Sequence, residues 1–169
     1  MALHLIVDGY NLIRQSPLLQ ELDAGELEAG RQALLARLAA YRRRRPPHKI
    51  TVVFDGWQGG DLKECRDRCQ GMAIIYSRRG EKADEVIKRL LAVERERAVV
   101  VTSDREIQEG ARRVGATWIS APEFDRRLVL GGELSEDTDE PAPRGTQKKG
   151  ASRRLPKSQR RRQQRLKKL

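Results

Sequence analysis

The chain has 169 residues, of which 35 are Lys or Arg and 24 are Asp or Glu, and its formal net charge is +11. This length fits one domain, and no apolar run reaches the roughly 20 residues that a membrane-spanning helix needs. Cysteine occurs only twice, which excludes a disulfide framework and predicts a reducing, cytoplasmic location. The first residues lack a charged leader, and Asp8 interrupts their apolar run, so a secretory signal is not expected.

The positive charge is distributed unevenly along the chain. Residues 1–140 contain 23 basic and 24 acidic side chains, whereas residues 141–169 contain 12 basic and no acidic side chains. A basic segment with Pro, Gly, Ser and Gln buries too little apolar area to offset its ordering entropy. We therefore expect a folded domain over 1–132, an acidic linker over 133–140 and a disordered basic tail thereafter. The tail's charge indicates a polyanion such as RNA or the ribosome, and its few leucines do not predict membrane binding.

Apolar runs and helical spacings alternate along the folded part of the chain. We expect five strands, at residues 3–7, 50–54, 73–77, 98–102 and 117–120. We expect helices at residues 25–44, 61–70, 81–97, 106–114 and 122–131. Strands that are apolar throughout are typical of a parallel sheet with helices on both faces. The predicted fold class is therefore α/β, with helices on both sides of a central, mainly parallel sheet.

Acidic residues stand where the predicted strands end. Asp8 and Asp55 directly follow the first and second strands, and Asp104 lies two residues past the fourth. Asp84 lies in the first turn of the helix after the third strand. The carboxyl ends of parallel strands meet at one edge of a sheet, so these four carboxylates should gather there and require cations. Mg²⁺ or Mn²⁺ would suit such oxygen ligands and would assist the attack of water on a phosphodiester.

Each aspartate also has a purely structural explanation, because Asp after a strand is common in turns and at helix starts. Only the combination of four points to chemistry. Other sites fit less well, since the chain has no Gly-x-x-x-x-Gly-Lys phosphate loop, and Tyr10 stands where an aspartyl nucleophile would have a second Asp. His4 and His48 do not end strands, which argues against a His-based nucleophile. Cys65 and Cys69 lack two further soft ligands for zinc and are interpreted as ordinary thiols.

Four sequence blocks resemble a known protein family. They are VDGYNLI (7–13), VVFDG (52–56), GEKADEVI (80–87) and VTSD (101–104). In this order and spacing they are similar to the NYN division of the PIN-like nucleases, and most of all to its YacP-type branch, over residues 1–130. The resemblance implies a three-layer PIN-like fold and divalent-metal-dependent endoribonuclease activity. It also implies a role in the cleavage of messenger RNA on the translating ribosome.

The resemblance implies site residues position by position. Asp8, Asp84 and Asp104 match carboxylates that hold Mg²⁺ or Mn²⁺. Asp55 matches the acidic position after the second strand and would complete the pocket. Asn11 matches the polar partner of the first carboxylate and would orient ligand or substrate. All five are catalytic candidates.

Four further residues are supporting candidates with an equally good structural explanation. Glu81 and Glu85 flank the helix carboxylate, although Glu in a first helical turn is already favoured by the helix dipole. Thr102 and Ser103 could hydrogen-bond a water or a ligand carboxylate, and Ser is just as common as a helix cap.

Basic and aromatic residues near the predicted site are candidates for RNA contacts. Arg78, Arg79 and Lys82 precede the helix carboxylate and would position RNA through its phosphates without reading its sequence. Trp57, in the loop after the second strand, would either stack on an unpaired base or anchor the loop. In the tail, the RNA-binding candidates are Arg160, Arg161 and Arg162.

Two classes of function stay open at this point. The first is a metal-dependent endoribonuclease, and the alternative is a non-catalytic RNA- or ribosome-binding adaptor that retains a PIN-like fold. The intact set of carboxylates favours the enzyme, because an adaptor has no need of several close acids. A third reading, hydrolysis of DNA or of structured nucleic acid, differs from the first only in substrate.

Overall fold

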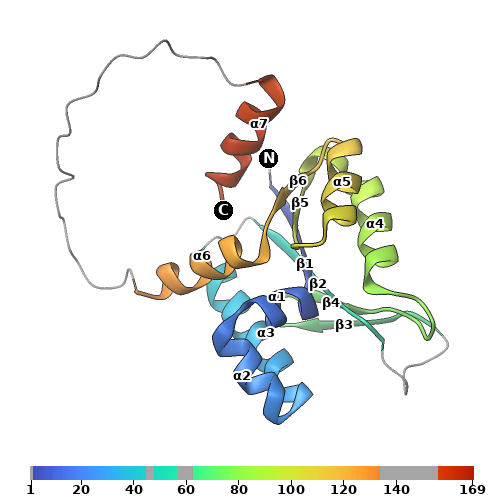
Figure 1. Cartoon of the computed structure of the whole chain (residues 1–169), viewed down its shortest axis with the longest axis vertical. Helices are drawn as coiled ribbons and strands as arrows, with labels where there is room; N and C mark the ends of the chain where they lie inside the picture. Colours follow the sequence, from blue (N-terminus) through green and yellow to red (C-terminus); the bar gives the residue numbers. More distant parts are fainter. Residues whose placement is uncertain (1, 45–47, 57–62, 134–155) are drawn as a thin grey trace.

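The computed structural model describes residues 2–44, 48–56, 63–133 and 156–169 (Figure 1). Strands and helices alternate through most of this length, as the apolar pattern predicts. The strands are β1 (His4–Asp8), β2 (Lys49–Phe54), β3 (Cys65–Cys69), β4 (Met72–Tyr76), β5 (Ala98–Val101) and β6 (Thr117–Ile119). The helices are α1 (Gly9–Gln15), α2 (Pro17–Gly25), α3 (Leu27–Arg44), α4 (Ala83–Glu94), α5 (Arg105–Arg113), α6 (Ala121–Glu133) and α7 (Lys157–Leu166), with a 3₁₀ turn at Arg95–Arg97.

The strands form one sheet in the order β3-β4-β2-β1-β5-β6. Every neighbouring pair is parallel except β3 and β4. The chain builds the sheet outward from β1 through β2 to β4, and then returns to the other side of β1 to add β5 and β6. The direction of winding therefore changes between β1 and β5. In open α/β sheets, ligands bind beyond the carboxyl ends of the strands at this point.

Helices cover both faces of the sheet, which confirms the predicted α/β class with helices on both sides. Helices α1, α2, α3 and α6 lie on one face, and α4 and α5 lie on the other (Figure 1). Successive strand residues serve opposite faces. Leu5 and Val7 of β1 belong to the core beneath α3, whereas Ile6 between them belongs to the core beneath α4. The side chains of Leu5, Ile6 and Val7 are fully buried, so both cores are shielded from solvent at β1.

Residues 65–69 form the edge strand β3, so the helix predicted over 61–70 is wrong for these residues. The strand turns back onto β4 through Gln70 and Gly71, which both have positive φ, at 48° and 79°. Two such residues are the signature of a tight hairpin turn. The charged segment CRDRC is as compatible with an exposed edge strand as with the predicted helix. Charged side chains on an edge strand discourage pairing with another chain.

Residues 9–25 form two short helices that the sequence analysis did not predict. Pro17 occupies the first turn of α2, where its missing N–H costs nothing. Leu12 of α1 and Leu19 of α2 are fully buried against the sheet face that α3 covers. Each helix contributes only one or two apolar residues per turn to the core, and this weak periodicity explains why it was missed.

Helix α7 lies within the tail that was expected to be disordered, and that expectation is wrong for residues 157–166. Leu166 and Leu169 are buried in the core beneath α3. The Tyr41 hydroxyl donates a hydrogen bond to the Leu169 carbonyl oxygen at 2.7 Å, and His48 Nε2 lies 2.8 Å from the carbonyl oxygen of Lys168. The acidic linker and tail residues 134–155 lie outside the described residues.

The contacts of α7 place it at the amino ends of the strands. Arg165 donates to the carbonyl oxygen of Gly115, just before β6, at 2.9 Å. Arg162 lies over the Trp118 ring at 4.0 Å from its centroid. His48, which faces Lys168, stands just before β2. Helix α7 therefore lies at the edge of the sheet opposite the carboxyl ends (Figure 1). In the described parts of the chain, no helix has the length and apolar character to cross a membrane.

Substituting Leu166 by Ala should lower the free energy of unfolding by about 2 kcal/mol, because the change leaves a cavity where α7 meets the core. Urea unfolding followed by circular dichroism measures this loss. Gln163→Ala, on the exposed face of the same helix, is the matched control and should change stability little. Equal unfolding curves for both variants and the native chain would show that α7 does not dock in solution.

Candidate active site

The candidate site begins with Asp8, where β1 ends beside β5. Parallel pairing puts Val7 opposite Val101, so Asp8 and Thr102, which follow them, lie side by side. The Thr102 hydroxyl donates to Asp8 Oδ2 at 3.2 Å and accepts the Asp104 backbone N–H at 3.1 Å. Asp8 is only 8% exposed. One buried hydroxyl thus links the Asp8 carboxylate to the backbone of Asp104 at the change in winding direction.

Asn11 and the start of α5 are joined in the same place. The Asn11 Oδ1 atom accepts the Ser103 backbone N–H at 2.8 Å, which ties α1 to the loop after β5. Asp104 is the N-cap of α5, and its Oδ1 accepts the N–H groups of Glu106 and Ile107 at 2.7 and 3.3 Å. Capping satisfies backbone donors of the first turn and fixes the carboxylate. The second oxygen of Asp104 forms no hydrogen bond among the described residues.

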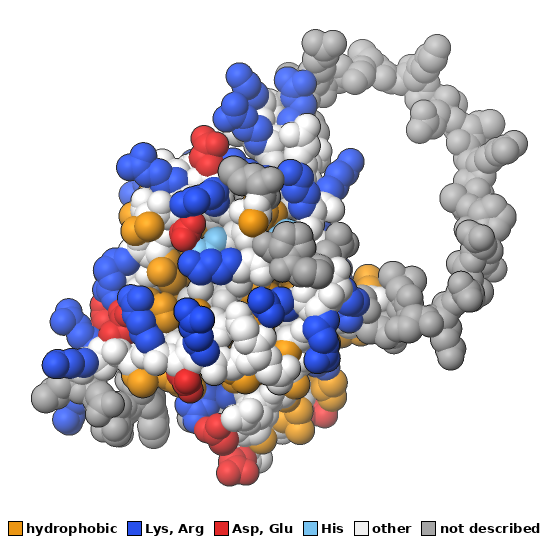
Figure 2. Space-filling model, turned by 180° about the vertical axis from the view of Figure 1, so that it is seen from behind, with side chains coloured by type: hydrophobic (Ala, Val, Ile, Leu, Met, Phe, Trp, Pro, Cys, Tyr) orange, Lys and Arg blue, Asp and Glu red, His pale blue; other side chains and the backbone are white. Residues whose placement is uncertain are grey.

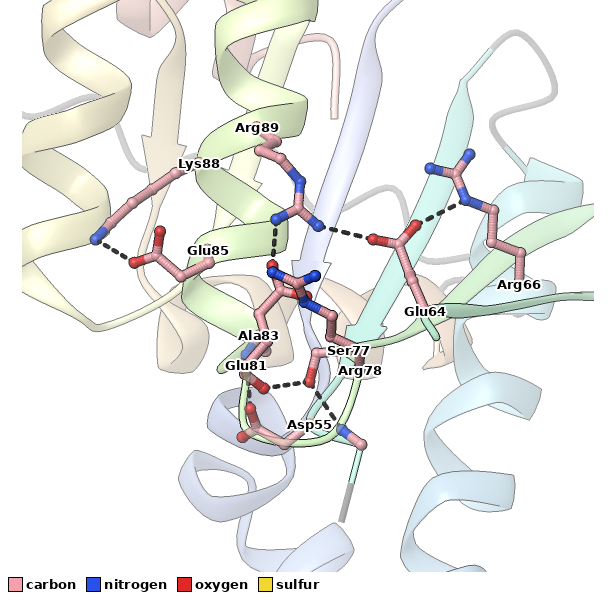
Figure 3. Close-up of polar contacts among 11 residues, drawn as sticks. Asp55, Glu64, Arg66, Ser77, Arg78, Glu81, Ala83, Glu85, Lys88 and Arg89 are labelled. Carbon is pink, nitrogen blue, oxygen red and sulfur yellow. Dashed lines mark hydrogen bonds and ion pairs between the residues drawn. The ribbon is translucent and has the colours of Figure 1, made fainter. Parts of the chain in front are cut away.

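A clamp between two loops holds Asp55 against the start of α4, the helix that carries Asp84 (Figure 3). Asp55 Oδ1 accepts the backbone N–H of Ala83, the first residue of α4, at 2.6 Å. The Ser77 hydroxyl accepts the Gly56 N–H at 2.9 Å and donates to the Glu81 carbonyl oxygen at 2.7 Å. The end of β2 and the start of α4 are therefore held against each other at the carboxyl edge of the sheet.

The pKa values of Asp8 and Asp84 are both raised, in part by the charges of neighbouring aspartates. Burial raises the pKa of Asp8 to about 6, and repulsion from Asp84 and Asp55 acts in the same direction. Burial also raises the pKa of Asp84, and the charges of Asp104 and Asp55 raise it further. These mutual effects agree with the predicted gathering of all four at one edge.

The chemistry of this donor set fits a hard divalent cation. Within the described residues, none of the four aspartates forms an ion pair with Lys, Arg or His. The glutamates of α4, and those of the loops just before β3 and α4, do form such pairs. As they lie in the structure, however, no three acidic, His or Cys side chains of the described residues are grouped closely enough to hold a metal ion. The metal ligands Asp8, Asp84 and Asp104 therefore stay a prediction.

The supporting candidates divide into two groups. Thr102 and Ser103 lie within the site, where Thr102 contacts Asp8 and the Ser103 hydroxyl accepts the Ala121 N–H at 3.3 Å. Glu81 and Glu85 point away to basic partners. Glu81 pairs with Arg78 and Arg89, and Glu85 pairs with Lys88 (Figure 3). Their ion pairs indicate a structural role at the start of α4.

The residues predicted to bind RNA are spread over the molecule. Arg78, Arg79 and Lys82 are exposed in the loop between β4 and α4, next to the clamp that holds Asp55. Trp57 lies outside the described residues. Of the three tail arginines, Arg160 and Arg161 are exposed on α7, and Arg162 covers Trp118. These three lie at the amino edge of the sheet, far from the carboxylates.

The sequence analysis missed the residues that hold the site in shape. Ser77 joins the β2 and β4 loops, and the Gln108 amide donates to the Thr102 carbonyl oxygen at 2.9 Å. Gly56 is required, because a Cβ there would collide with the Ser77 carbonyl oxygen. Gly9 is required for a similar reason, since a Cβ would meet the Phe54 ring. The only sequence signal was the Asp-Gly pair after both β1 and β2.

Comparisons with known proteins agree with this geometry. The model of the family described as "YacP-like NYN domain" matches residues 5–168, a stretch that includes α7. The chain is 33% identical to the uncharacterized protein YacP of Bacillus subtilis (strain 168) over 129 residues, which cover 73% of this chain and 74% of the relative. The crystal structure of Rae1 (YacP) from Bacillus subtilis matches this chain with a TM-score of 0.64 at 30% sequence identity, and the match covers 79% of this chain and 76% of that one. The crystal structure of a mutant form of Rae1 (YacP) matches with a TM-score of 0.63 at 29% identity, and covers 79% of this chain and 78% of that one.

Substituting Asp8 by Asn should stabilise the protein at neutral pH. The folded-state pKa of Asp8 is raised from 3.8 to about 6, so its contribution to stability is present below pH 4 and is lost as the pH rises to about 6. Removing the charge should recover up to about 3 kcal/mol above that pH, at 1.36 kcal/mol per pKa unit. Thermal unfolding from pH 4 to 8 measures the difference.

Asp125→Asn is the matched control for this prediction. Asp125 is also buried, but it lies 3.4 Å from Arg37 and so has a cationic partner. The same substitution there should lower stability, because it leaves the charge of Arg37 without its counterion. A loss of stability in both variants at pH 8 would contradict the assignment of an uncompensated charge to Asp8.

Proposed function

The chain belongs to the family of YacP-like NYN domains, and from this premise we propose that it is a divalent-metal-dependent endoribonuclease. NYN domains are PIN-like nucleases, so the family supports a nuclease that acts on RNA. The single observation that carries the finer proposal is the set of four aspartates at the carboxyl edge of the sheet. Burial and repulsion within this set raise the pKa of Asp8 and of Asp84, and none of the four forms an ion pair with a basic side chain among the described residues.

Each residue of the site would have a separate task in this reaction. Asp8, Asp84 and Asp104 would hold Mg²⁺ or Mn²⁺, and the bound ion would lower the pKa of its water and neutralise charge on the phosphoryl oxygens. Thr102 keeps Asp8 turned toward the site through its hydroxyl. Asn11, already fixed by the Ser103 N–H, would orient substrate with its side-chain NH₂ group, which donates no hydrogen bond within the described residues.

Asp55 would act mainly through position. One of its oxygens is occupied by the Ala83 N–H, which leaves the other to face the acidic pocket. The exposed Arg78, Arg79 and Lys82 stand beside it and would contact the phosphates that flank the cleaved bond. These contacts do not read base sequence, so the proposal predicts weak sequence preference from this part of the site.

The natural substrate proposed for this activity is messenger RNA on the translating ribosome, in the cytoplasm. This part follows from the family resemblance and from the excess positive charge of residues 141–169. The adaptor alternative shares the fold and the basic charge but not the need for clustered acids. DNA as substrate is the other alternative, because the phosphates offer the same contacts.

In the test, labelled RNA is incubated with the purified chain and Mn²⁺ or Mg²⁺, free and on translating ribosomes. Asp8→Asn and Asp84→Asn should each reduce the cleavage rate at least about 100-fold, because each loss removes several kcal/mol of charge stabilisation. Glu109→Gln, an equivalent change at an exposed position on α5, is the control and should cleave normally.

A second readout separates metal binding from catalysis. Mn²⁺ should raise the unfolding temperature of the native chain and of Glu109→Gln, but not that of Asp8→Asn. Cleavage that is equal in all variants would refute the assigned site. RNA binding without any cleavage, on ribosomes and with metal, would favour the adaptor. Equal cleavage of matched DNA and RNA strands would widen the substrate class.

A further inference from the structure

A groove runs along the α4 face of the sheet, away from the acidic pocket. Helix α4 packs over β1, β2 and β5, and the sheet edge beyond β2 is only partly covered on this side, because Ile75 of β4 is buried beneath α4 while β3 is exposed. The groove near the amino edge has a volume of about 480 Å³. Its floor contains Thr51, Ala73 and Ile75, and Leu90 and Glu94 of α4 line it on one side.

The opposite wall is formed by arginines of the edge strand. Arg66 and Arg68 pair with Ile75 and Ala73 across the hairpin, and paired residues place their side chains on the same face of a sheet. Ile75 belongs to the core beneath α4. The hairpin register therefore directs both arginines into the groove, while Cys65 and Cys69 take the other face.

Along this groove three acids are covered and their Lys and Arg partners are exposed, whereas Glu85, near Lys82, is 58% exposed. The side chains of Glu81, Glu94 and Glu64 are 8%, 16% and 20% exposed. Their Lys and Arg partners are 54% to 72% exposed, and they are Lys49, Arg66, Arg78, Arg89 and Arg97, while Glu94 also pairs with the buried His4. The glutamates thus hold the basic side chains in place from below, and a ligand in the groove meets mainly positive charge. Figure 2 shows the same predominance of Lys and Arg over Asp and Glu on the face drawn there.

One ionic network extends the basic lining from the groove to the acidic pocket (Figure 3). Arg66 Nε lies 2.8 Å from Glu64, and Glu64 lies 2.7 Å from Arg89. Arg89 also pairs with Glu81, which pairs with Arg78 at 3.5 Å. Two further hollows, of about 300 and 720 Å³, lie along this network and share its side chains. The second is lined by Lys82, two residues before Asp84.

We propose that this groove between β3 and α4 binds the phosphate backbone of single-stranded RNA and leads the strand from the amino edge of the sheet to the aspartates. The proposal rests on the proposed nuclease function, since it names the path by which the substrate reaches that site. No aromatic side chain lines the described part of the groove. Binding would therefore depend on charge rather than on base stacking, and would not depend on sequence.

The test measures binding of a labelled single-stranded RNA of about 16 nucleotides, near the upper site size of one small domain. The Asp84→Asn background prevents cleavage during the measurement. Replacing Arg66 and Arg68 together by Gln should weaken binding and reduce the slope of log affinity against log salt by about 1.4, at about 0.7 per lost phosphate contact. Arg66→Lys with Arg68→Lys keeps the charge and should restore the slope.

The matched control is the pair Arg112→Gln and Arg113→Gln, which removes the same charge from exposed positions on α5. In the chain that keeps Asp84, replacing Arg66 and Arg68 together by Gln should raise KM for the long RNA and leave kcat unchanged. Circular dichroism and thermal unfolding verify that each variant is folded.

The outcomes separate this proposal from the proposed function. The groove assignment is overturned if the Arg66/Arg68 variant and the Arg112/Arg113 variant bind RNA equally well, or if the native chain binds no RNA. Equal RNA binding by the two variants is the result expected if the groove instead binds an acidic protein partner. If the native chain cuts RNA, and the Arg66/Arg68 variant cuts and binds RNA as well as the Arg112/Arg113 variant, the proposed nuclease function is supported and the proposed groove is refuted. If nothing is cut but binding depends on Arg66 and Arg68, the groove stands and the nuclease fails.

Discussion

The parallel pairing of β1 with β5 is the constraint on which the candidate site depends. Their register continues past the last paired residues, so that Asp8 and Thr102 are adjacent although they are far apart in sequence. Because the chain reverses its direction of winding here, no connection crosses the carboxyl ends of these two strands. Helix α1, which carries Asn11, and the loop that carries Asp104 then converge from either side. Without this pairing, the acidic residues would be ordinary turn and cap residues.

The structure separates charges that stabilise the fold from charges that do not. Glutamates of α4 and its flanking loops have basic partners, and the pKa of Glu81 and of Glu94 is lowered, Glu81 chiefly by its hydrogen bond with Arg89. The aspartates at the carboxyl edge behave in the opposite way, since burial raises the pKa of Asp8 and of Asp84. A sheet with two closed cores can tolerate this local cost. Perturbed carboxylates in such a place are typical of functional sites.

The sequence predicted those parts of the molecule that follow from local patterns. Continuous apolar runs identified the parallel strands, and the position of Asp8 at a strand end was enough to predict the edge where it lies. Helix α7 depends on a partner distant in sequence, Tyr41, and the charged strand β3 pairs with its neighbour β4, but charged segments carry no periodic apolar signal of such contacts. The same limit applied to Ser77, whose importance comes from a contact with Gly56.

The net charge acquires a different meaning once burial is considered. Residues 1–140 are almost neutral by count, yet several of their acids are covered by the bases they hold, so their outer surface along α4 and β3 is basic. The described part of the basic tail is docked at the amino edge, where Leu166 is buried and Arg162 covers Trp118. Positive charge next to the aspartates therefore comes from the folded domain itself. A polyanionic strand would meet it along the groove, with α7 at the opposite end of the sheet from the four aspartates.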